Sequence, residues 1–474
     1  MLAKRIAVNT IISAGARVIG ILLAFLIIGL ITRYLTKTEW GEYSIILTFG
    51  GIGAVLADMG FYRLMVREIS KPDSDEKRVV SNIFTLRLIS GLFIFAAAPL
   101  ASLLFPYSGQ ARLGIVVGMI GFWFLADSQV LMGLFQKYLQ MDKVAMAELA
   151  GRVIQLFLTW IFIKLGYSFL FLVSALTISG LVNFLLIYWW AREHCKLRLS
   201  FDWPYWKKIL AQSYPLAIAS VLVMIYFSSD SLFLSALKPA ADVGVYRLSY
   251  KILESLIFFP AMFVGLIMPL LANSAKFDPA KFKNIFQRGS DVLMIFAVPL
   301  VLGTFILSPA LINLLGGGQY SESAPILNIL IIAVGVIFFG TLFSYVLIAL
   351  EKQKSLLWIS AVGAVFNVAA NLILIPRYSY YAAAATTVAT EALVAILMAI
   401  AIWRFFHWLP SFKIIFKCLL SSLIMVAALW LLSGYNLGLL FVVAIVMYFS
   451  ALYLLRGFSK AEVLDLVRRE EGKI

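Results

Sequence analysis

Arg17 has the clearest chemical potential in the chain, because it lies in the middle of an apolar stretch from Ile6 to Ile31. About 20 apolar residues are enough to cross a lipid bilayer as a helix. A guanidinium near the bilayer centre costs at least about 2.5 kcal/mol, so Arg17 must face protein, water or a ligand rather than lipid. Gly20 and Ala24 follow on the same face and keep it narrow. We interpret this face as one wall of an intramembrane cavity for an anion; alternatively, Arg17 pairs with a carboxylate on a neighbouring helix.

Four acidic side chains also interrupt apolar stretches, namely Asp58, Asp127, Asp230 and Glu391. A carboxylate in a cavity whose wetness changes gains and loses protons as its surroundings change. These four residues are therefore candidates for coupling transport to a proton or another cation. The alternative is a permanent salt bridge, for example between Glu391 and Arg17.

Two further charged pairs have a simpler structural explanation. Glu148 and Arg152 are four residues apart, and Lys251 and Glu254 are three apart. At these spacings two side chains meet on one helix face. We expect each pair to form an ion pair on its own helix.

The composition of the chain indicates that these residues lie on membrane-spanning helices. Of the 474 residues, 62% are hydrophobic, which is typical of a helical protein that crosses the membrane many times. The formal net charge of +15 does not indicate nucleic-acid binding, because the basic residues are scattered through short connections. Counting apolar stretches predicts fourteen spans, at 6–31, 44–64, 82–105, 113–135, 145–165, 169–190, 209–237, 244–272, 289–315, 324–350, 355–375, 381–403, 414–433 and 437–455.

The distribution of Lys and Arg predicts the orientation. Most of them fall in connections on the side of the N-terminus, whereas the opposite side carries only Arg33, Lys37, Arg112, Lys164, Lys238, Arg247 and Arg377. Because cytoplasmic connections are rich in Lys and Arg, both termini are expected in the cytoplasm. The predicted location is the cell (plasma or inner) membrane, and a monomer is expected.

An internal repeat predicts two lobes. Gly41-Glu42-Tyr43 is matched by Gly244-Val245-Tyr246, 203 positions later, and Asn82-Ile83-Phe84 by Asn284-Ile285-Phe286, 202 positions later. A six-helix unit used twice in the same orientation would place the substrate path between its copies. We therefore predict an N-lobe at 1–208, a C-lobe at 209–407, and two helices with a cytoplasmic tail at 408–474. The stretch Ala191–Lys208, rich in aromatic and basic residues, should lie in the membrane interface as a linker.

Metal, disulfide and nucleotide chemistry are not expected. The two histidines, His194 and His407, and the two cysteines, Cys195 and Cys418, all lie outside the predicted spans or near their cytoplasmic ends. A histidine proton relay, a zinc centre and a disulfide are therefore not predicted. Gly316-Gly317-Gly318 lacks the residues that follow a phosphate-binding loop, so no cofactor is expected.

Several loop motifs resemble those of a known family. Arg33-Tyr34-Leu35 with Glu39-Trp40-Gly41-Glu42-Tyr43 resembles the first external loop of Wzx-type polysaccharide (lipid-linked oligosaccharide) flippases. Asp58-Met59-Gly60-Phe61 and Val66-Arg67-Glu68-Ile69 are similar to the end of their second helix, and Val243-Gly244-Val245-Tyr246, Gly318-Gln319-Tyr320 and Ala324-Pro325 to their later external turns. The likeness extends over the first twelve predicted spans.

The resemblance implies the multidrug/oligosaccharidyl-lipid/polysaccharide exporter fold and a flippase. Such a protein moves polyprenyl-diphosphate-linked sugar units from the cytoplasmic to the outer leaflet by alternating access, coupled to protons or membrane potential. Arg17, Arg87 and Lys251 would then be successive stations for the pyrophosphate, because arginine is well suited to binding phosphate. Glycosyltransferases and a polymerase of polysaccharide assembly are the implied partners.

Four alternatives remain open at this point. A drug/cation antiporter of the same fold would favour an acidic cavity, and Lipid II is another cargo for that fold. A membrane-embedded polysaccharide polymerase or ligase would need long external loops, which this sequence lacks. A purely structural membrane protein would have no use for charges at mid-depth.

Overall fold

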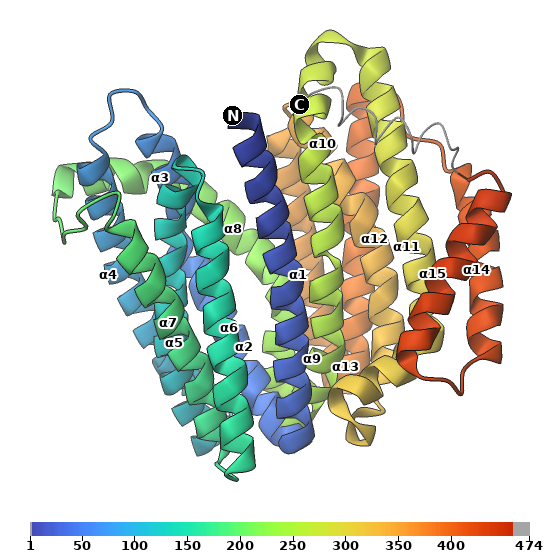
Figure 1. Ribbon diagram of the computed structural model, residues 1–474, viewed down its shortest axis with the longest axis horizontal. Helices are drawn as coiled ribbons and strands as arrows, with labels where there is room; N and C mark the ends of the chain where they lie inside the picture. The colour runs from blue at the N-terminus through green and yellow to red at the C-terminus, as the bar shows by residue number, and fades with distance from the viewer. Residues whose placement is uncertain (1, 458–474) are drawn as a thin grey trace. The chain divides into compact units, whose positions relative to one another are not determined.

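The computed structural model describes residues 2–457, apart from the side chains of residues 2–14 and of 215, 216, 219, 223 and 226 within one helix. Within that range the chain folds into fifteen α-helices and one short 3-10 helix, with no β-strand (Figure 1). Twelve helical segments of the described chain are long and apolar enough to cross a membrane. The predicted all-α, multi-pass membrane fold is confirmed. The predicted tail after residue 457 lies outside the described residues.

The chain divides into two compact units, Met1–Gly244 and Val245–Ile474. The first contains α1 (Leu2–Tyr34), α2 (Lys37–Asp58), α3 (Phe61–Ile69), α4 (Glu76–Ser102), α5 (Gly109–Lys137), α6 (Met141–Lys164), α7 (Phe169–Ala191), α8 (Trp203–Leu237) and the start of α9 (Ala240–Leu256). Helix α5 is its centre, because it packs against α2, α3, α4 and α7. At its crossing with α7, a Cβ at Gly180 would lie only 2.5 Å from the carbonyl oxygen of Gly121. Only glycine allows so close an approach of two helices.

The second unit contains the rest of α9, α10 (Phe258–Phe277), α11 (Pro279–Gly316), a 3-10 turn (Gly318–Tyr320), α12 (Ser323–Ala349), α13 (Gln353–Phe406), α14 (Ile414–Leu431) and α15 (Leu437–Leu454). Helix α12 packs against α10, α11 and α13. The α14–α15 hairpin packs on α11 through a separate apolar cluster that includes Leu307, Met425 and Tyr448. The Tyr448 hydroxyl donates to the carbonyl oxygen of Ile295 at 2.8 Å, which fixes the hairpin to α11.

The helices depart from the predicted spans at spans 2 and 8, each of which is divided in two: α2 with α3, and α9 with α10. Predicted spans 11 and 12 both lie within α13, which is two helices joined by a kink at Ser379, where φ is 49° and ψ is −131°. Predicted span 7 corresponds to α8, which begins earlier than expected, at Trp203. The exact number of fourteen spans stays a prediction.

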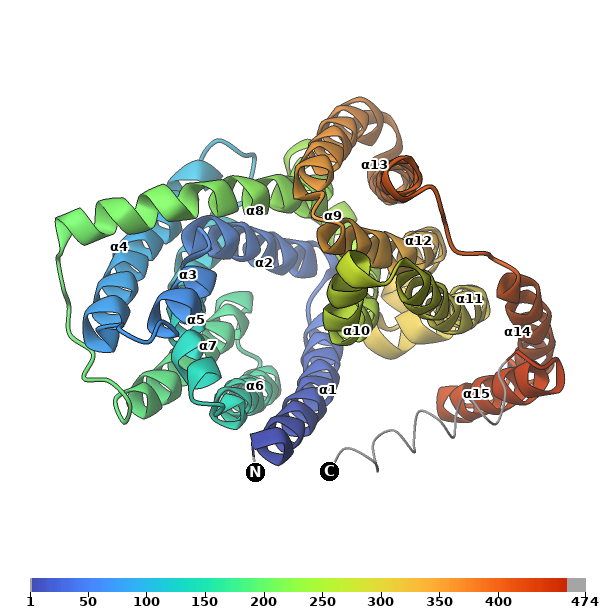
Figure 2. The same ribbon diagram turned by 90° about the horizontal axis from the view of Figure 1, so that it is seen from above.

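The boundary between the units also falls later than the predicted lobe boundary at residue 208. Helix α8 packs on α2, α3 and α4, so it belongs to the first unit, and Figure 2 shows it running beside these helices. Likewise, α14 and α15 belong to the second unit, because they pack on α11. The predicted lobes concern internal symmetry, and that symmetry stays a prediction.

The linker after α7 is attached to α4 through polar contacts. Asn82 Oδ1 accepts hydrogen bonds from the Trp206 indole at 3.0 Å and from the Asp202 N–H at 3.1 Å. The Ser200 N–H donates to Thr85 Oγ1 at 3.0 Å. Trp206 is buried, whereas Phe201 and Trp203 are exposed. Aromatic side chains on the outside suit a membrane interface, where we predict this segment to lie.

Two of the repeat motifs meet in the first unit. The Trp40 indole donates to the carbonyl oxygen of Gly244 at 3.1 Å. A Cβ at Gly41 would overlap the carbonyl oxygen of Ala240, and a Cβ at Gly244 would lie 2.7 Å from the carbonyl oxygen of Lys37 and 3.2 Å from the backbone nitrogen of Gly41. Both glycines are therefore required where these two backbone segments meet.

Candidate functional site

Arg17 lies on the exposed part of α1, beside α6. The bare face of Gly20, one turn further along α1, receives the Arg152 side chain of α6, whose Nε lies 3.4 Å from where a Cβ of Gly20 would be. Arg152 is influenced electrostatically by Glu148 on its own helix and by Arg17 across the helix contact. Two guanidinium groups, Arg17 and Arg152, and the Glu148 carboxylate therefore lie close to one another among the described residues of α1 and α6.

Arg152 is a residue that the sequence analysis did not assign to a site. The i,i+4 spacing from Glu148 predicted an ion pair; Glu148 acts on Arg152 electrostatically, but the described residues show no ion pair between the two. The spacing of Glu148 and Arg152 concerns α6 alone, so it cannot show that α6 packs against α1. The glycine at position 20 was the available signal, because a bare helix face invites a long side chain from a neighbour.

Arg87 on α4 is fully enclosed within the first unit, with an exposed fraction of 0%. Its Nε and Nη2 donate to the carbonyl oxygen of Ala126 on α5, at 3.3 and 3.1 Å. Its Nη1 has no hydrogen-bond partner among the described residues. The two charges that act on it are Asp58 and Asp127. Direct contact of Arg87 with a substrate stays a prediction, and it would require this cluster to open.

Asp127 lies next to Ala126 on α5 and is 1% exposed. Both of its carboxylate oxygens lack a hydrogen-bond partner within the described part of the chain. Asp58 ends α2, where its Oδ2 accepts from the Gly60 N–H at 3.2 Å in the sharp turn to α3. Asp58 is half-buried as a residue, but its Oδ1 is enclosed and has no hydrogen-bond partner within the described residues. The structure thus brings together three residues that the sequence suggested separately.

Lys251 is engaged in a local network on α9. Its Nζ donates to Glu254 Oε2 at 2.8 Å, as its spacing predicted, and Arg247 Nη2 lies 3.3 Å from Glu254 Oε1. Two cations therefore share the Glu254 carboxylate. Arg247 was not assigned by the sequence analysis, although it lies one turn before Lys251.

Asp230 and Glu391 are both buried, in α8 and α13 respectively. Asp230 Oδ1 accepts from the Ser231 N–H at 2.7 Å. Near Glu391 on α13, the Asn371 amide donates to Asn367 Oδ1 at 2.9 Å, and the Asn367 amide donates to Thr390 Oγ1 at 3.1 Å. Both acids lie among polar residues, as expected of a polar interior in a membrane protein. Their assignment to ion coupling stays a prediction.

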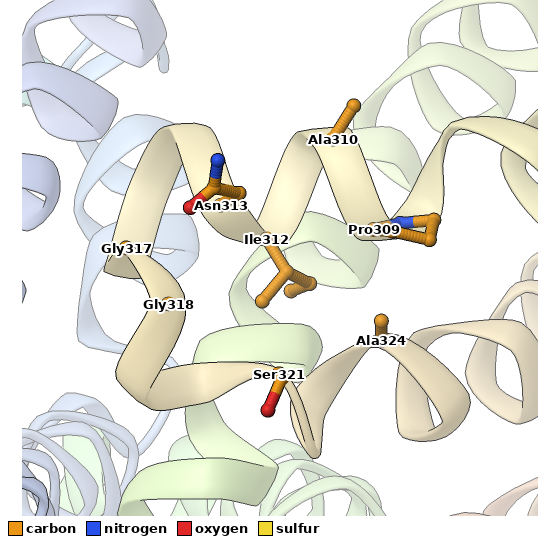
Figure 3. A pocket seen from close by; sticks show the side chains of 8 residues that line it. All are labelled: Pro309, Ala310, Ile312, Asn313, Gly317, Gly318, Ser321 and Ala324. Carbon is orange, nitrogen blue, oxygen red and sulfur yellow. The ribbon is translucent and has the colours of Figure 1, made fainter. Parts of the chain in front are cut away.

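A pocket of about 410 Å³ lies in the second unit, where α11 ends and α12 begins (Figure 3). Its lining includes Asn313 and Ser321 as polar side chains, together with Gly317, Gly318 and Ala324. No charged side chain lines it. It therefore lacks the cation that an anionic headgroup would need.

Comparison with known proteins places the chain in a family. A family model described as polysaccharide biosynthesis protein matches residues 30–325, which is more than half of the sequence. The chain belongs to the polysaccharide biosynthesis protein family. The resemblance seen in the loop motifs is thereby confirmed at the level of the family.

Individual relatives of this polysaccharide biosynthesis protein are distant but cover most of it. A protein of Haloferax volcanii named "Probable low-salt glycan biosynthesis flippase Agl15" is 21% identical over 430 residues, covering 88% of this chain and 87% of the relative. Among solved structures, the Lipid II flippase MurJ in an inward closed conformation matches with a TM-score of 0.76 at 14% identity, covering 97% of this chain and 100% of MurJ.

A multidrug resistance MATE family transporter of the MOP superfamily, in an inward-facing conformation, matches less closely. Its TM-score is 0.64 at 14% identity, with 83% of this chain and 98% of the transporter covered. At these identities the structural matches show the fold alone. That fold is the multidrug/oligosaccharidyl-lipid/polysaccharide exporter fold predicted from the sequence.

Proposed function

We propose that this polysaccharide biosynthesis protein is a flippase for lipid-linked oligosaccharides. It moves polyprenyl-diphosphate-linked repeat units from the cytoplasmic to the outer leaflet by alternating access. The family match and the flippase named among its relatives support this reading. The chain acts as a monomer in the plasma or inner membrane with both termini in the cytoplasm. It receives its cargo from membrane glycosyltransferases and delivers it to a polymerase.

The observation that carries this function is the pair of arginines where α1 meets α6. Arg17 is exposed there, and Arg152 lies against the adjacent glycine face. A pyrophosphate cannot enter hydrocarbon without cationic partners. Arginine provides a planar, permanently charged donor fork that matches phosphate oxygens. We propose that Arg17 and Arg152 bind the pyrophosphate, and that Arg87 and Lys251 act at later stages of its passage.

Ion coupling is the second part of this proposal. Asp58, Asp127, Asp230 and Glu391 are the candidate coupling residues, and three of them are almost completely buried. Alternating access changes the wetness of such sites and hence their affinity for a proton or cation. Coupling to a proton gradient or to the membrane potential supplies the energy for the directional movement of the cargo.

A drug/cation antiporter is the second candidate, because the MATE transporter shares the fold. An organic cation would need an excess of carboxylates at its site. The described residues at the α1–α6 contact instead bring two guanidinium groups, Arg17 and Arg152, close together. A lipid-linked anion is therefore the better match.

Binding measurements on the purified protein test this proposal. We expect Arg17→Gln and Arg152→Gln each to weaken binding of a fluorescent polyprenyl diphosphate about 10-fold or more, which corresponds to ~1.4 kcal/mol. Arg17→Lys should retain more affinity than Arg17→Gln, since the charge remains but the fork is lost. Lys164→Gln is the matched control, because Lys164 is an exposed cation at the far end of α6. Unchanged binding in both glutamine variants would remove the anion site from this face.

A further inference from the structure

The cluster of Arg87, Asp127 and Asp58 has an unusual distribution of hydrogen bonds. A buried arginine beside two carboxylates is expected to donate to them. Instead, Arg87 uses Nε and Nη2 on the carbonyl oxygen of Ala126, and its Nη1 has no partner within the described residues. The neighbouring carboxylate of Asp127 has none for either oxygen. Donor and acceptor are thus present in one enclosed place without being joined.

The surrounding helices hold Asp127 tightly. A Cβ at Gly91, one turn after Arg87 on α4, would lie 2.9 Å from Trp123 Cδ1 and 3.5 Å from Asp127 Oδ1. The Trp123 indole donates to the carbonyl oxygen of Leu88 at 3.2 Å. Helices α4 and α5 therefore pack tightly around the Asp127 carboxyl group. A charged carboxylate enclosed in this way without a partner is expensive, whereas the protonated form is neutral.

We infer that Asp127 is a proton-carrying carboxyl group and that Arg87 is its switching partner. In the protonated state Asp127 is neutral, and Arg87 donates to the Ala126 carbonyl, as in this structure. On release, the O–H bond of Asp127 breaks and its proton passes to water on the side of Asp58, which is half-buried. The carboxylate left behind then accepts hydrogen bonds from Arg87, which gives up the Ala126 carbonyl.

The charged groups around the site favour a proton over a metal ion. Arg87 is the charged group that acts on Asp127, and a metal cation beside this guanidinium would be repelled. On α7, which packs along α5, no charged residue occurs between Phe169 and Ala191. The end of α2 contributes Asp58, and Tyr62 on α3 faces that same acid. On α6, Glu148 and Arg152 act on each other.

The consequence for transport rests on the proposed function. When the Arg87 side chain of α4 moves from the Ala126 carbonyl to the Asp127 carboxylate, the contact between α4 and α5 in the core of the first unit changes. A proton taken up or released here would thereby bias the packing of this helix pair. The chemistry of the site itself does not depend on what the protein carries, so it can be tested without a cargo.

Infrared difference spectroscopy of the purified, reconstituted full chain between two pH values tests the inference directly. We expect a protonated-carboxyl C=O band that disappears as the pH rises, and this band should be absent in Asp127→Asn. Asparagine has the same shape as aspartate, so this variant should fold. Glu148→Gln, which removes a half-buried acid from the neighbouring α6, is the matched control and should keep the band.

The role of Arg87 is tested by the same measurement. In Arg87→Gln the band should persist at pH values at which it is lost in the unaltered protein, because a nearby positive charge favours the carboxylate. If Asp127→Asn keeps the band, or the unaltered protein has none, Asp127 is not a proton carrier. If the band of Arg87→Gln disappears at the same pH as in the unaltered protein, Arg87 is not its partner. None of these results bears on the flippase proposal, which the polyprenyl diphosphate binding measurements test separately.

Discussion

Arg17 and Arg87 show two ways of keeping a guanidinium inside a membrane protein. Arg87 is enclosed, and protein groups replace its hydration. Arg17 is exposed on a helix face beside a second arginine. The first arrangement restricts Arg87 to the groups enclosed with it, such as the Ala126 carbonyl and the Asp127 carboxyl group. The second leaves a charged group accessible to a ligand, which is why we assign anion binding to Arg17 and a switching role to Arg87.

Removing Arg87 should destabilise the first unit strongly. Arg87→Leu leaves the Ala126 carbonyl without its side-chain donors and removes the cation that stabilises the ionised forms of Asp127 and Asp58, and breaking a buried charge cluster in this way costs about 3–5 kcal/mol. We expect a clear fall in the melting temperature of the purified protein. The double variant Arg87→Leu/Asp127→Leu should recover much of the loss, because apolar side chains of suitable volume replace both charges.

An exposed arginine nearby provides the control for this comparison. Arg63→Leu on α3 should change the stability by no more than about 0.5 kcal/mol, since Arg63 is exposed. If Arg87→Leu melts like Arg63→Leu, the cluster does not contribute to stability in the way described here. If the double variant is less stable than Arg87→Leu, the charges are not coupled.

At the scale of elements, two connections determine how the helices of the first unit pack. The contact of Gly41 with Ala240 joins the start of α2 to the start of α9. The linker between α7 and α8 is attached to α4 by Asn82, Thr85 and Arg78. Both connections depend on backbone groups, so they depend on exact helix positions rather than on hydrophobicity.

The glycine contact gives a stability prediction with a control on the same helix. Gly41→Ala forces a methyl group against the backbone of Ala240 and should cost about 1–3 kcal/mol. Gly51→Ala should be neutral or stabilising, because nothing lies within 4 Å of its Cβ position and alanine favours the helix. Melting temperatures of the two variants measure the difference. Equal melting temperatures would mean that α2 and α9 do not need this contact.

The linker gives a pH prediction. Asp202 accepts hydrogen bonds from the Arg78 guanidinium and from the Tyr205 N–H. The Arg78 guanidinium, and to a lesser extent the Tyr205 N–H, holds the pKa of Asp202 below its ordinary value. The folded pKa therefore lies below that of the unfolded chain, which is about 3.9. The stability that this group contributes is present above the unfolded pKa and is lost as the pH falls through the folded pKa.

Melting curves recorded from neutral to acidic pH test this behaviour. Asp202→Asn should melt earlier than the unaltered protein at neutral pH, and the two should converge at the most acidic values. Asp73→Asn, which removes an exposed acid in the turn before α4, is the control. A constant difference between Asp202→Asn and the unaltered protein at every pH would contradict the prediction.

Much of this element structure follows from local sequence, and the contacts between elements do not. The length of the apolar stretch around Arg17 determines a membrane helix, and the spacing of Lys251 and Glu254 determines their ion pair. The meeting of Arg17 with Arg152, or of Arg87 with Ala126, depends on which helices pack together. The membrane helices are apolar on nearly every face, so their hydrophobic pattern does not specify their neighbours.

At the scale of the whole molecule, the chain combines an apolar exterior with charges at a few interior places. The match of 97% of the chain to the Lipid II flippase MurJ shows that the two share a fold. The family and the pair of arginines where α1 meets α6 together favour a lipid-linked anion as the cargo. A cargo with a charged head and a sugar chain needs both cationic groups and a polar interior.

Flipping by the reconstituted protein is the most direct test of this account. Lipid-linked oligosaccharide extracted from the organism that encodes the chain is placed in both leaflets of vesicles, and its accessibility to an external lectin is measured. We predict that the inner-leaflet pool becomes accessible when the protein is present, and that it stays inaccessible with the Arg17→Gln/Arg152→Gln double variant. An inner pool that remains inaccessible with the unaltered protein, in vesicles that export small organic cations, would contradict the flippase function.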